Sequence, residues 1–136
     1  MRITFPYEAK PSVIFKIVRR PIVLVDLWSS KFDRLITYSF LVDTGADYTL
    51  LPKTIAQDLG IDLTKDCKQY ESKGIGGKEK VYLLKKKLFI MIGKTKRQIP
   101  IGFLQHDDIP PLLGRQKCLD TFDVIFSKFS TTFFSK

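Results

Sequence analysis

One aspartate in this chain of 136 residues stands where a carboxylate could do chemistry. Asp43 follows the apolar run Phe40-Leu41-Val42 and precedes Thr44 and Gly45. An apolar strand that ends in a tight turn places such a carboxylate at a partly buried position, where its charge is costly unless hydrogen bonds hold it or it is neutralised. Thr44 offers a hydroxyl, and Gly45 lets the backbone come close. The tripeptide alone arises by chance in about a few per cent of chains this long, so an ordinary strand-to-turn segment is the alternative to a catalytic carboxylate.

Acid–base hydrolysis of a peptide needs two carboxylates that share a proton, because one group cannot be acid and base at once. Two adjacent carboxylates repel one another when both are charged, so the pair titrates in separate steps. The chain contains no second Asp-Thr-Gly or Asp-Ser-Gly. If Asp43 is catalytic, its partner must therefore come from a second copy of the chain across a two-fold axis.

Other candidates for chemistry carry less weight. Gly74-Ile75-Gly76-Gly77 indicates the tip of a β-hairpin and lacks the Lys-Ser/Thr ending of a phosphate-binding loop. His106, the only histidine, stands among acidic residues, which favours a polar loop over a metal site or a charge relay. Cys67 and Cys118 have no Cys-x-x-Cys spacing, so a zinc site cannot be assembled. We expect no metal and no cofactor, and both thiols reduced.

Short strands are expected to position these residues. β-forming side chains dominate residues 12–18, 21–28 and 35–42. Further strands are predicted on both sides of the glycine tip at 69–71 and 81–83, then at 87–92, 98–103 and 122–126.

One helix is predicted over residues 54–59, with Pro52 at its start and Gly60 after its end. A short helical turn is expected at 116–119. Many short strands with one helix indicate a mostly-β barrel or sandwich.

Composition bounds the class of protein. The length and the 44% of hydrophobic residues predict a single domain over residues 1–136. The net charge is +9, but the basic residues are spread along the chain, and the only dense run, 85–87, is typical of a lysine-guarded strand edge. No nucleic-acid recognition motif is present. The apolar runs at 21–25 and 88–92 are too short to cross a bilayer, and the N-terminus lacks a secretory signal, so we expect a cytoplasmic protein without membrane or specific nucleic-acid partners.

Three segments together resemble one family. Residues 41–47, Leu-Val-Asp-Thr-Gly-Ala-Asp, resemble the catalytic motif of the retropepsins, the homodimeric aspartic proteases of retroviruses and their cellular and bacterial relatives. Gly74-Ile75-Gly76-Gly77 resembles the tip of the flap hairpin of that family, and Leu112-Leu113-Gly114-Arg115 resembles its second motif. The resemblance covers roughly residues 35–126. It implies a mostly-β, retropepsin-like closed β-barrel, one half of the acid protease, with one or two short helices, which acts as a homodimer on peptide or protein substrates.

The resemblance also implies roles for individual residues. Asp43 would hold and activate the attacking water with its copy in the partner, Thr44 would bond across the dimer axis, and Gly45 would bring the backbone close to the carboxylate. The residues implied in substrate binding are Ala46, Asp47, Gly74, Ile75 and Gly76. The residues implied in support are Leu112, Leu113, Gly114 and Arg115, with an ion pair between Arg115 and Asp47.

The chain departs from the family pattern at some positions. Tyr48 stands where many retroviral members have a small or acidic residue, and Gln116 replaces the usual Asn or Asp. Both termini are extended, so the sheet that joins retroviral dimers is expected to be built differently. Two alternatives remain: a retropepsin-like dimer that binds peptides without cutting them, and a basic module for nucleic acid or an acidic partner. The intact Asp-Thr-Gly-Ala favours the protease over the first, and the scattered charge argues against the second.

Overall fold

Short β-strands make up most of the chain in the computed structural model, which describes residues 1–74 and 77–135. The strands are β1 (Arg2–Pro6), β2 (Glu8–Ser12), β3 (Lys16–Arg20), β4 (Ile22–Ser29), β5 (Arg34–Val42), β6 (Thr49–Leu51), β7 (Cys67–Gly74), β8 (Gly77–Leu84), β9 (Leu88–Ile92), β10 (Thr95–Ile99), β11 (Ile101–Leu104), β12 (Leu112–Leu113), β13 (Asp123–Ser127) and β14 (Ser130–Phe134). One α-helix, α1 (Lys53–Asp58), and one 3₁₀ helix, η1 (Leu119–Thr121), accompany them. The mostly-β class predicted from the sequence is confirmed.

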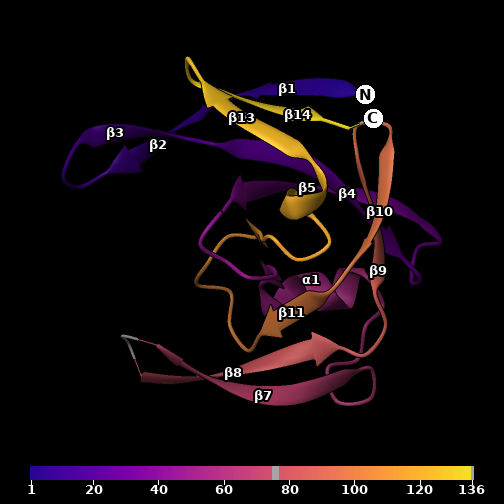
Figure 1. Ribbon diagram of the computed structural model, residues 1–136. Helices are drawn as coiled ribbons and strands as arrows, with labels where there is room; N and C mark the ends of the chain where they lie inside the picture. Colours follow the sequence, from indigo (N-terminus) through magenta and orange to yellow (C-terminus); the bar gives the residue numbers. More distant parts are fainter. Residues whose placement is uncertain (75–76, 136) are drawn as a thin grey trace.

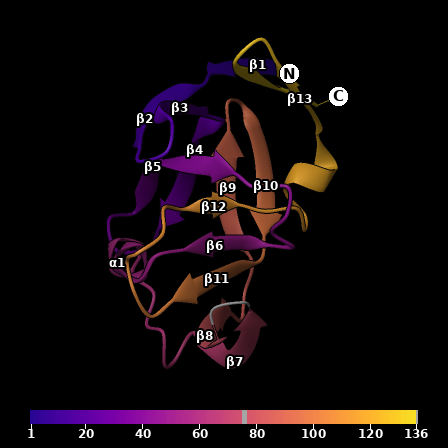
Figure 2. The same ribbon diagram turned by 90° about the vertical axis from the view of Figure 1, so that its left-hand side faces the viewer.

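A nine-stranded sheet forms the body of the molecule, in the order β10-β9-β4-β5-β12-β6-β11-β8-β7. The β4–β5 hairpin runs through its middle, from Ile22 opposite Leu41 to Ser29 opposite Arg34. Buried and less buried residues alternate along β4, as expected for a strand with one face on the core. Figure 2 shows the short β12 between β5 and β6, although these strands lie far apart in the sequence.

The expected closed barrel is wrong for the described residues. The sheet has two edges, β10 and β7, and no described strand joins them. The β7–β8 hairpin causes this opening, because most of its side chains beyond Cys67 are exposed and it extends away from the core instead of curling back to β10 (Figure 1). A strand without a packed inner face has no apolar contact that would draw it into a closed barrel.

The core lies inside the curve of this sheet. Phe40, Ile90 and Phe103 are completely buried there, and α1 contributes Ile55 and Ala56. The predicted limits of the helix are confirmed to within one residue: Pro52 is the N-cap. Gly60 then has φ of 72°, and a side chain there would meet Ser30 Oγ at 2.7 Å, so glycine is required after the helix.

The two ends of the chain meet in a separate three-stranded sheet, β1-β14-β13. The Met1 amino group donates a hydrogen bond to Ser135 O at 2.7 Å, and the termini lie side by side in Figure 1. Phe133 of β14 is buried and joins this sheet to the main core. Whether this sheet differs from the one that joins retroviral dimers stays a prediction.

Two predicted strands are wrong in their limits. Residues 12–18 were expected to be one strand, but residues 13–15 form the turn between β2 and β3, and Lys16 has φ of 65°. Residues 98–103 were expected to be one strand, but the chain breaks at Pro100 between β10 and β11. Proline has no N–H for the ladder, which explains the second break.

The helical turn expected at 116–119 occurs slightly later, as η1. None of the helices in the described ranges is long and apolar enough to cross a membrane.

Candidate active site

Asp43 lies at the end of β5, half-buried, in a loop that hydrogen bonds hold from two sides. Its N–H donates to Leu113 O at 3.0 Å, and its carbonyl oxygen accepts from the Ala46 N–H at 3.1 Å. Its carboxylate oxygen Oδ1 accepts from the Gly45 N–H at 3.0 Å. The partly buried strand end predicted for this carboxylate is confirmed, and one of its oxygens is oriented by the backbone.

Gly45 matters for its small size. A Cβ at this position would lie 3.3 Å from Asp43 Oδ1, which is tighter than an ordinary contact. Any larger residue would therefore press on the carboxylate. Thr44 and Gly45 are both exposed, so the loop presents its polar groups to the surface.

The second motif is built directly against this loop. Leu112 and Leu113 pair in parallel with Leu41 and Val42, so the two motif strands lie side by side. Gly114 comes directly after Leu113 and is buried, and its N–H donates to Thr49 Oγ1 at 3.0 Å.

Gly114 allows the closest backbone approach in this region. A Cβ on it would lie 2.2 Å from the carbonyl carbon of Tyr48 and 2.3 Å from its oxygen. Only glycine fits at this distance, so the second motif can insert between β5 and β6 only with glycine at this position.

The ion pair expected between Arg115 and Asp47 is not formed. Arg115 Nε instead lies 3.0 Å from Asp120 Oδ1. Asp47 is exposed to solvent, so it needs no cation to compensate for burial. The two segments are joined through the backbone, since the Arg115 N–H donates to Ala46 O at 3.0 Å and the Gln116 N–H to Asp47 O at 2.8 Å. The acidic partner five residues later in the sequence was the signal that the sequence reasoning missed.

The β7–β8 hairpin stands over Tyr48, the residue noted as a departure from the family pattern. Tyr48 lines a mostly apolar hollow of about 410 Å³. The other residues of this hollow are Tyr70, Glu71, Ser72, Val81, Leu83, Pro100 and Gln116. Burial, with the nearby charge of Asp47, raises the pKa of the Tyr48 phenol. Of the predicted flap tip, Gly74 pairs with Gly77, and Ile75 and Gly76 lie outside the described residues.

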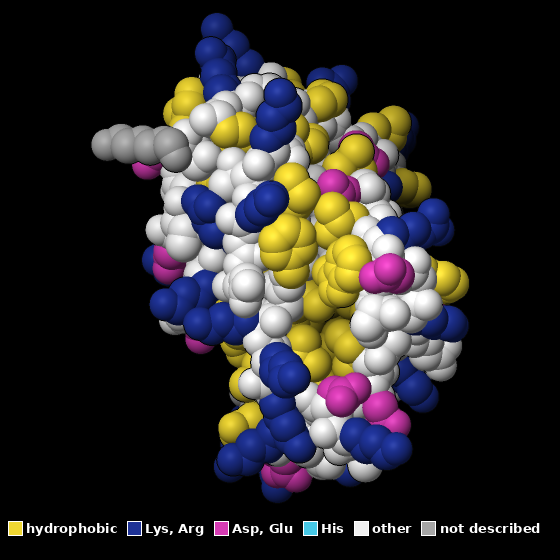
Figure 3. Space-filling view, turned by 90° about the vertical axis from the view of Figure 1, so that its right-hand side faces the viewer, with side chains coloured by type: hydrophobic (Ala, Val, Ile, Leu, Met, Phe, Trp, Pro, Cys, Tyr) yellow, Lys and Arg dark blue, Asp and Glu magenta, His cyan; other side chains and the backbone are white. Residues whose placement is uncertain are grey.

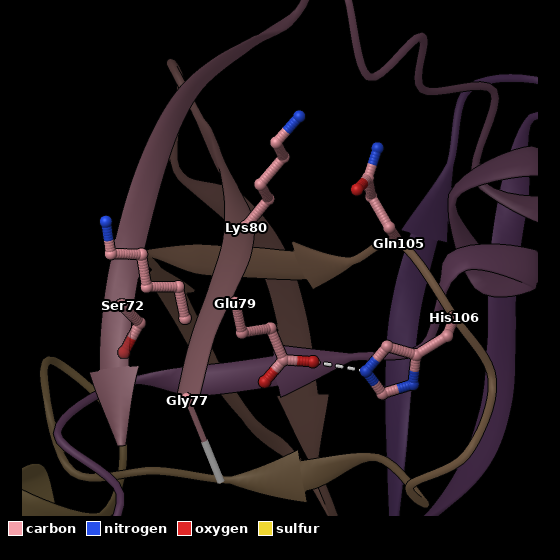
Figure 4. A pocket seen from close by; sticks show the side chains of 7 residues that line it. Ser72, Gly77, Glu79, Lys80, Gln105 and His106 are labelled. Carbon is pink, nitrogen blue, oxygen red and sulfur yellow. Dashed lines mark hydrogen bonds and ion pairs between the residues drawn. The ribbon is translucent and has the colours of Figure 1, made fainter.

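A polar hollow of about 560 Å³ lies closer to the tip of the hairpin, and Ser72 lines both hollows (Figure 4). Glu79 of β8 and His106, from the segment after β11, form an ion pair across it, and His106 Nδ1 lies 3.5 Å from Asp108 Oδ2. The hydrogen bond to Glu79 is the main cause that raises the pKa of His106. The lining of this hollow includes no residue of the segment from Asp43 to Tyr48 and none of the segment from Leu112 to Gln116, so we do not assign it as the active site. The polar loop predicted around His106 is present, but its attachment to β8 was not foreseen.

The cysteines and acidic groups form no metal site within residues 1–74 and 77–135, where no cluster of three or more potential ligands occurs. Cys67 and Cys118 are both buried and are not bonded to one another. Burial raises the pKa of the Cys67 thiol to about 11 and that of Cys118 to about 12, so both thiols are poor nucleophiles at neutral pH.

Comparisons with known proteins agree with this geometry. A family model described as aspartyl protease matches residues 31–116. The crystal structure of a retropepsin-like aspartic protease from Rickettsia conorii is similar over 97% of this chain and 98% of that chain, with a TM-score of 0.68 and 22% sequence identity. That similarity shows a shared fold. No match was found among curated protein sequences.

Proposed function

Because this chain belongs to the aspartyl protease family, we propose that it is an aspartic endopeptidase whose active unit is a homodimer with one Asp43 from each copy. One observation carries the proposal. Asp43 lies where the two motif strands meet, its N–H is bound to Leu113 O, and its carboxylate is oriented by the Gly45 N–H at a half-exposed position. A carboxylate fixed in this way is ready to act on a water molecule.

In the proposed reaction the two Asp43 carboxyl groups share one proton. The ionised group accepts a proton from a water molecule, whose oxygen attacks the peptide carbonyl carbon. The protonated group donates its proton to the carbonyl oxygen. When the tetrahedral intermediate breaks down, the C–N bond is cleaved, the first carboxyl group gives the proton that it took from water to the leaving amine, and the second accepts a proton from a hydroxyl of the intermediate, so the pair again shares one proton.

The surface around Thr44 supports a second copy at this place. Thr44 is exposed and borders a hollow of about 380 Å³, lined also by Leu119, Phe122, Val124 and Phe126 and by the Arg115–Asp120 pair. Apolar side chains around an exposed hydroxyl suit a protein contact better than open solvent. We propose that Thr44 contacts its own copy there.

Substrate would lie between the Asp43 loop and the β7–β8 hairpin. The apolar hollow under Tyr48 suits an apolar substrate side chain, since its lining residues come from both the body and the hairpin. Ala46, Asp47 and Gly74 border this space in the proposal, and the hairpin acts as the flap. We also propose that residues 1–136 work as one domain, because the two motifs and the hairpin all belong to the same sheet.

The test compares the wild type with Asp43→Asn and with a matched control, Asp33→Asn. Each protein is incubated with a mixed peptide library, and the products are identified by mass spectrometry. Asp33 is exposed, lies at the far end of β5 and has φ of 53°, a backbone conformation that asparagine tolerates. We expect Asp43→Asn to abolish cleavage while its circular dichroism spectrum and melting temperature stay near wild type, and Asp33→Asn to cleave normally.

Two outcomes would contradict the proposal. Substantial cleavage by purified Asp43→Asn would show that another group attacks the peptide. A wild type that binds library peptides without cutting them would favour the non-catalytic peptide-binding dimer instead.

A further inference from the structure

The second and third strands form a hairpin that belongs to neither of the other sheets. β2 and β3 pair from Glu8 opposite Arg20 to Ser12 opposite Lys16, and with no other described strand. A lone two-stranded ribbon is marginally stable in water, so it needs further contacts. We call this hairpin, residues 8–20, the arm.

The end of the arm is strongly apolar and uncovered. Val13, Ile14, Phe15 and Ile17 have relative exposures of 104%, 81%, 71% and 63%, which are the four highest among the exposed large hydrophobic residues described. A cluster of this kind at the end of a projecting hairpin marks a contact surface more often than a free surface.

The base of the arm is fixed, so its direction is set by the body. The Tyr7 N–H donates to Phe129 O at 2.8 Å, and the Arg19 guanidinium lies 4.9 Å from the centre of the Phe129 ring. Pro21 O, just after the arm, accepts a hydrogen bond from the Val42 N–H at 2.9 Å. The arm therefore leaves the body beside the residue that precedes Asp43.

The arm projects from the same side as the Asp43 loop. In Figure 1, β5 points to the left toward its end at Val42, and the β2–β3 hairpin extends further to the left. Figure 2, which views that side, shows β2 and β3 on the face where β12, β6 and the β7–β8 hairpin also lie. The opposite face, in Figure 3, has its own apolar stripe framed by lysine and arginine, but that stripe faces away from this side.

We propose that the arm lies across the second copy of the chain and buries its apolar tip there. This proposal rests on the proposed function, because a partner that brings its Asp43 to this Asp43 must occupy this face. The arm begins beside Val42 and has five residue pairs, so it extends about 17 Å over that partner. A two-fold axis makes the contact reciprocal, so each copy is held by the arm of the other.

The positive charge of the arm suggests an alternative partner for it. Lys10, Lys16, Arg19 and Arg20 outnumber its one acidic residue, Glu8. A basic hairpin with an apolar tip would also suit an anionic lipid surface. A substitution in the tip of the arm can distinguish the two partners. It weakens dimerisation only if the arm contacts a second copy of the chain.

The test uses the full chain with Phe15→Ser and, as a matched control, Phe32→Ser. Phe32 is also exposed, at 48%, but lies in the turn at the other end of the β4–β5 hairpin. Sedimentation equilibrium gives the dimer Kd of each protein. We expect Phe15→Ser to raise Kd about 100-fold, since each dimer has two arms and each loses about tenfold. We expect Phe32→Ser to leave Kd unchanged, and denaturant unfolding of the monomer to be the same for both.

A second measurement locates the contact. A photo-crosslinking amino acid replaces Ile14, the chain is mixed with isotopically labelled chain, and the crosslinked peptides are identified by mass spectrometry. We expect crosslinks between labelled and unlabelled chains.

Several results would contradict the proposed role of the arm. If Phe15→Ser dimerises like the wild type, or residue 14 crosslinks only within its own chain, the arm proposal is wrong. The proposed function would still stand in that case, provided that the dimer cleaves peptides. If Phe15→Ser keeps its Kd but loses binding to phosphatidylserine-containing vesicles, the occupant is a lipid surface. If the wild type stays monomeric at every concentration, both the arm and the paired-aspartate mechanism fail.

Discussion

Two glycines determine how tightly the chain packs around Asp43. Gly114 lets the second motif approach the Tyr48 carbonyl group, while Gly45 leaves room for the carboxylate of Asp43. The first is buried and the second is exposed. They should therefore differ in what a methyl group does to the protein: one position controls stability, and the other controls the geometry of the site.

Gly114→Ala should destabilise the fold. The added Cβ would lie 2.2 Å from a backbone carbon, and backbone cannot move aside as a flexible side chain can. Separating β12 from β6 also strains the hydrogen bond between Gly114 N and Thr49 Oγ1. We expect the free energy of unfolding to fall by about 3 kcal/mol or more in urea denaturation. A wild-type midpoint for this variant would show that the two strands can separate without cost.

Gly45→Ala should instead reduce activity. Its Cβ would press on Asp43 Oδ1 at 3.3 Å, so the carboxylate must turn or shift. A misplaced catalytic group costs up to about 100-fold in rate, and an exposed loop contributes little to stability. Steady-state kinetics should show a reduced kcat with a urea midpoint near wild type. A variant with normal kcat would mean that the position of this oxygen does not matter.

At this scale the sequence was most informative where backbone geometry allows only one residue type. Asp43, Gly45 and Gly114 lie next to one another as their motifs implied. The partner of Arg115 could not be predicted in the same way, because a long flexible side chain can reach either of two carboxylates. The solvent exposure of Asp47, which removes its need for a cation, becomes visible only in the folded chain.

Among the elements, the β7–β8 hairpin depends on few contacts. Its β8 strand pairs with β11 through Val81, Tyr82 and Leu83. Closer to the tip, Glu79 is joined to His106 (Figure 4). Asp107 and Asp108 on the same loop add negative charge near the imidazole. The ion pair therefore attaches the outer part of the hairpin to the body.

This attachment should depend on pH. The pKa of His106 is raised in the folded protein, so its stabilising effect is complete below the unfolded value of about 6.5 and is lost as pH rises through the folded pKa. His106 is the only histidine, so its ring protons can be followed in NMR spectra without overlap from another histidine. We expect a titration midpoint above that of an unstructured histidine. We also expect the amide protons near Glu79 to exchange faster above that midpoint, relative to an unstructured chain at the same pH.

Glu79→Gln is the matched control, because it keeps the shape of the side chain and removes its charge. The midpoint of His106 should then fall toward that of an unstructured histidine, and the pH dependence of amide exchange near residue 79 should weaken. A midpoint that is the same in wild type and Glu79→Gln would show that the ion pair does not hold the hairpin.

Local patterns located most strands, but they could not determine how the strands end. The predictions at 21–28 and 35–42 match β4 and β5 closely, because each strand buries one face on the core. Residues 13–15 have the same β-forming composition, yet they turn in solvent. The closed barrel failed for a related reason, since whether the hairpin packs back on β10 depends on long-range contacts that no local pattern reports.

For the whole molecule, each chain supplies one Asp43, so the proposed unit of activity is the pair. A single copy leaves exposed both Thr44 and the apolar tip of the arm. These exposed groups are hard to interpret from one chain, because a sequence does not say which apolar residues face a partner and which face its own core. In the proposed dimer they belong to one continuous contact around the two aspartates.

Mixing active and inactive chains should therefore reduce the activity of the active ones. When a fixed amount of wild type is incubated with a ninefold excess of Asp43→Asn until the subunits have exchanged, random pairing places most wild-type chains beside an inactive copy. The cleavage rate should fall to about one tenth of the rate without the mutant chain.

The same excess of serum albumin, which cannot pair with the chain, should leave the rate unchanged. At a protein concentration above the wild-type Kd but below the raised Kd of Phe15→Ser, Asp43→Asn that also carries Phe15→Ser should inhibit less, because a mixed pair has only one intact arm and binds about tenfold more weakly. An enzyme that cuts as a monomer would keep its full rate in every mixture, and that result would exclude a shared pair of aspartates. Progressive inhibition by Asp43→Asn alone, with the double variant less effective, would locate both the catalytic carboxylate and the contact that brings its partner to it.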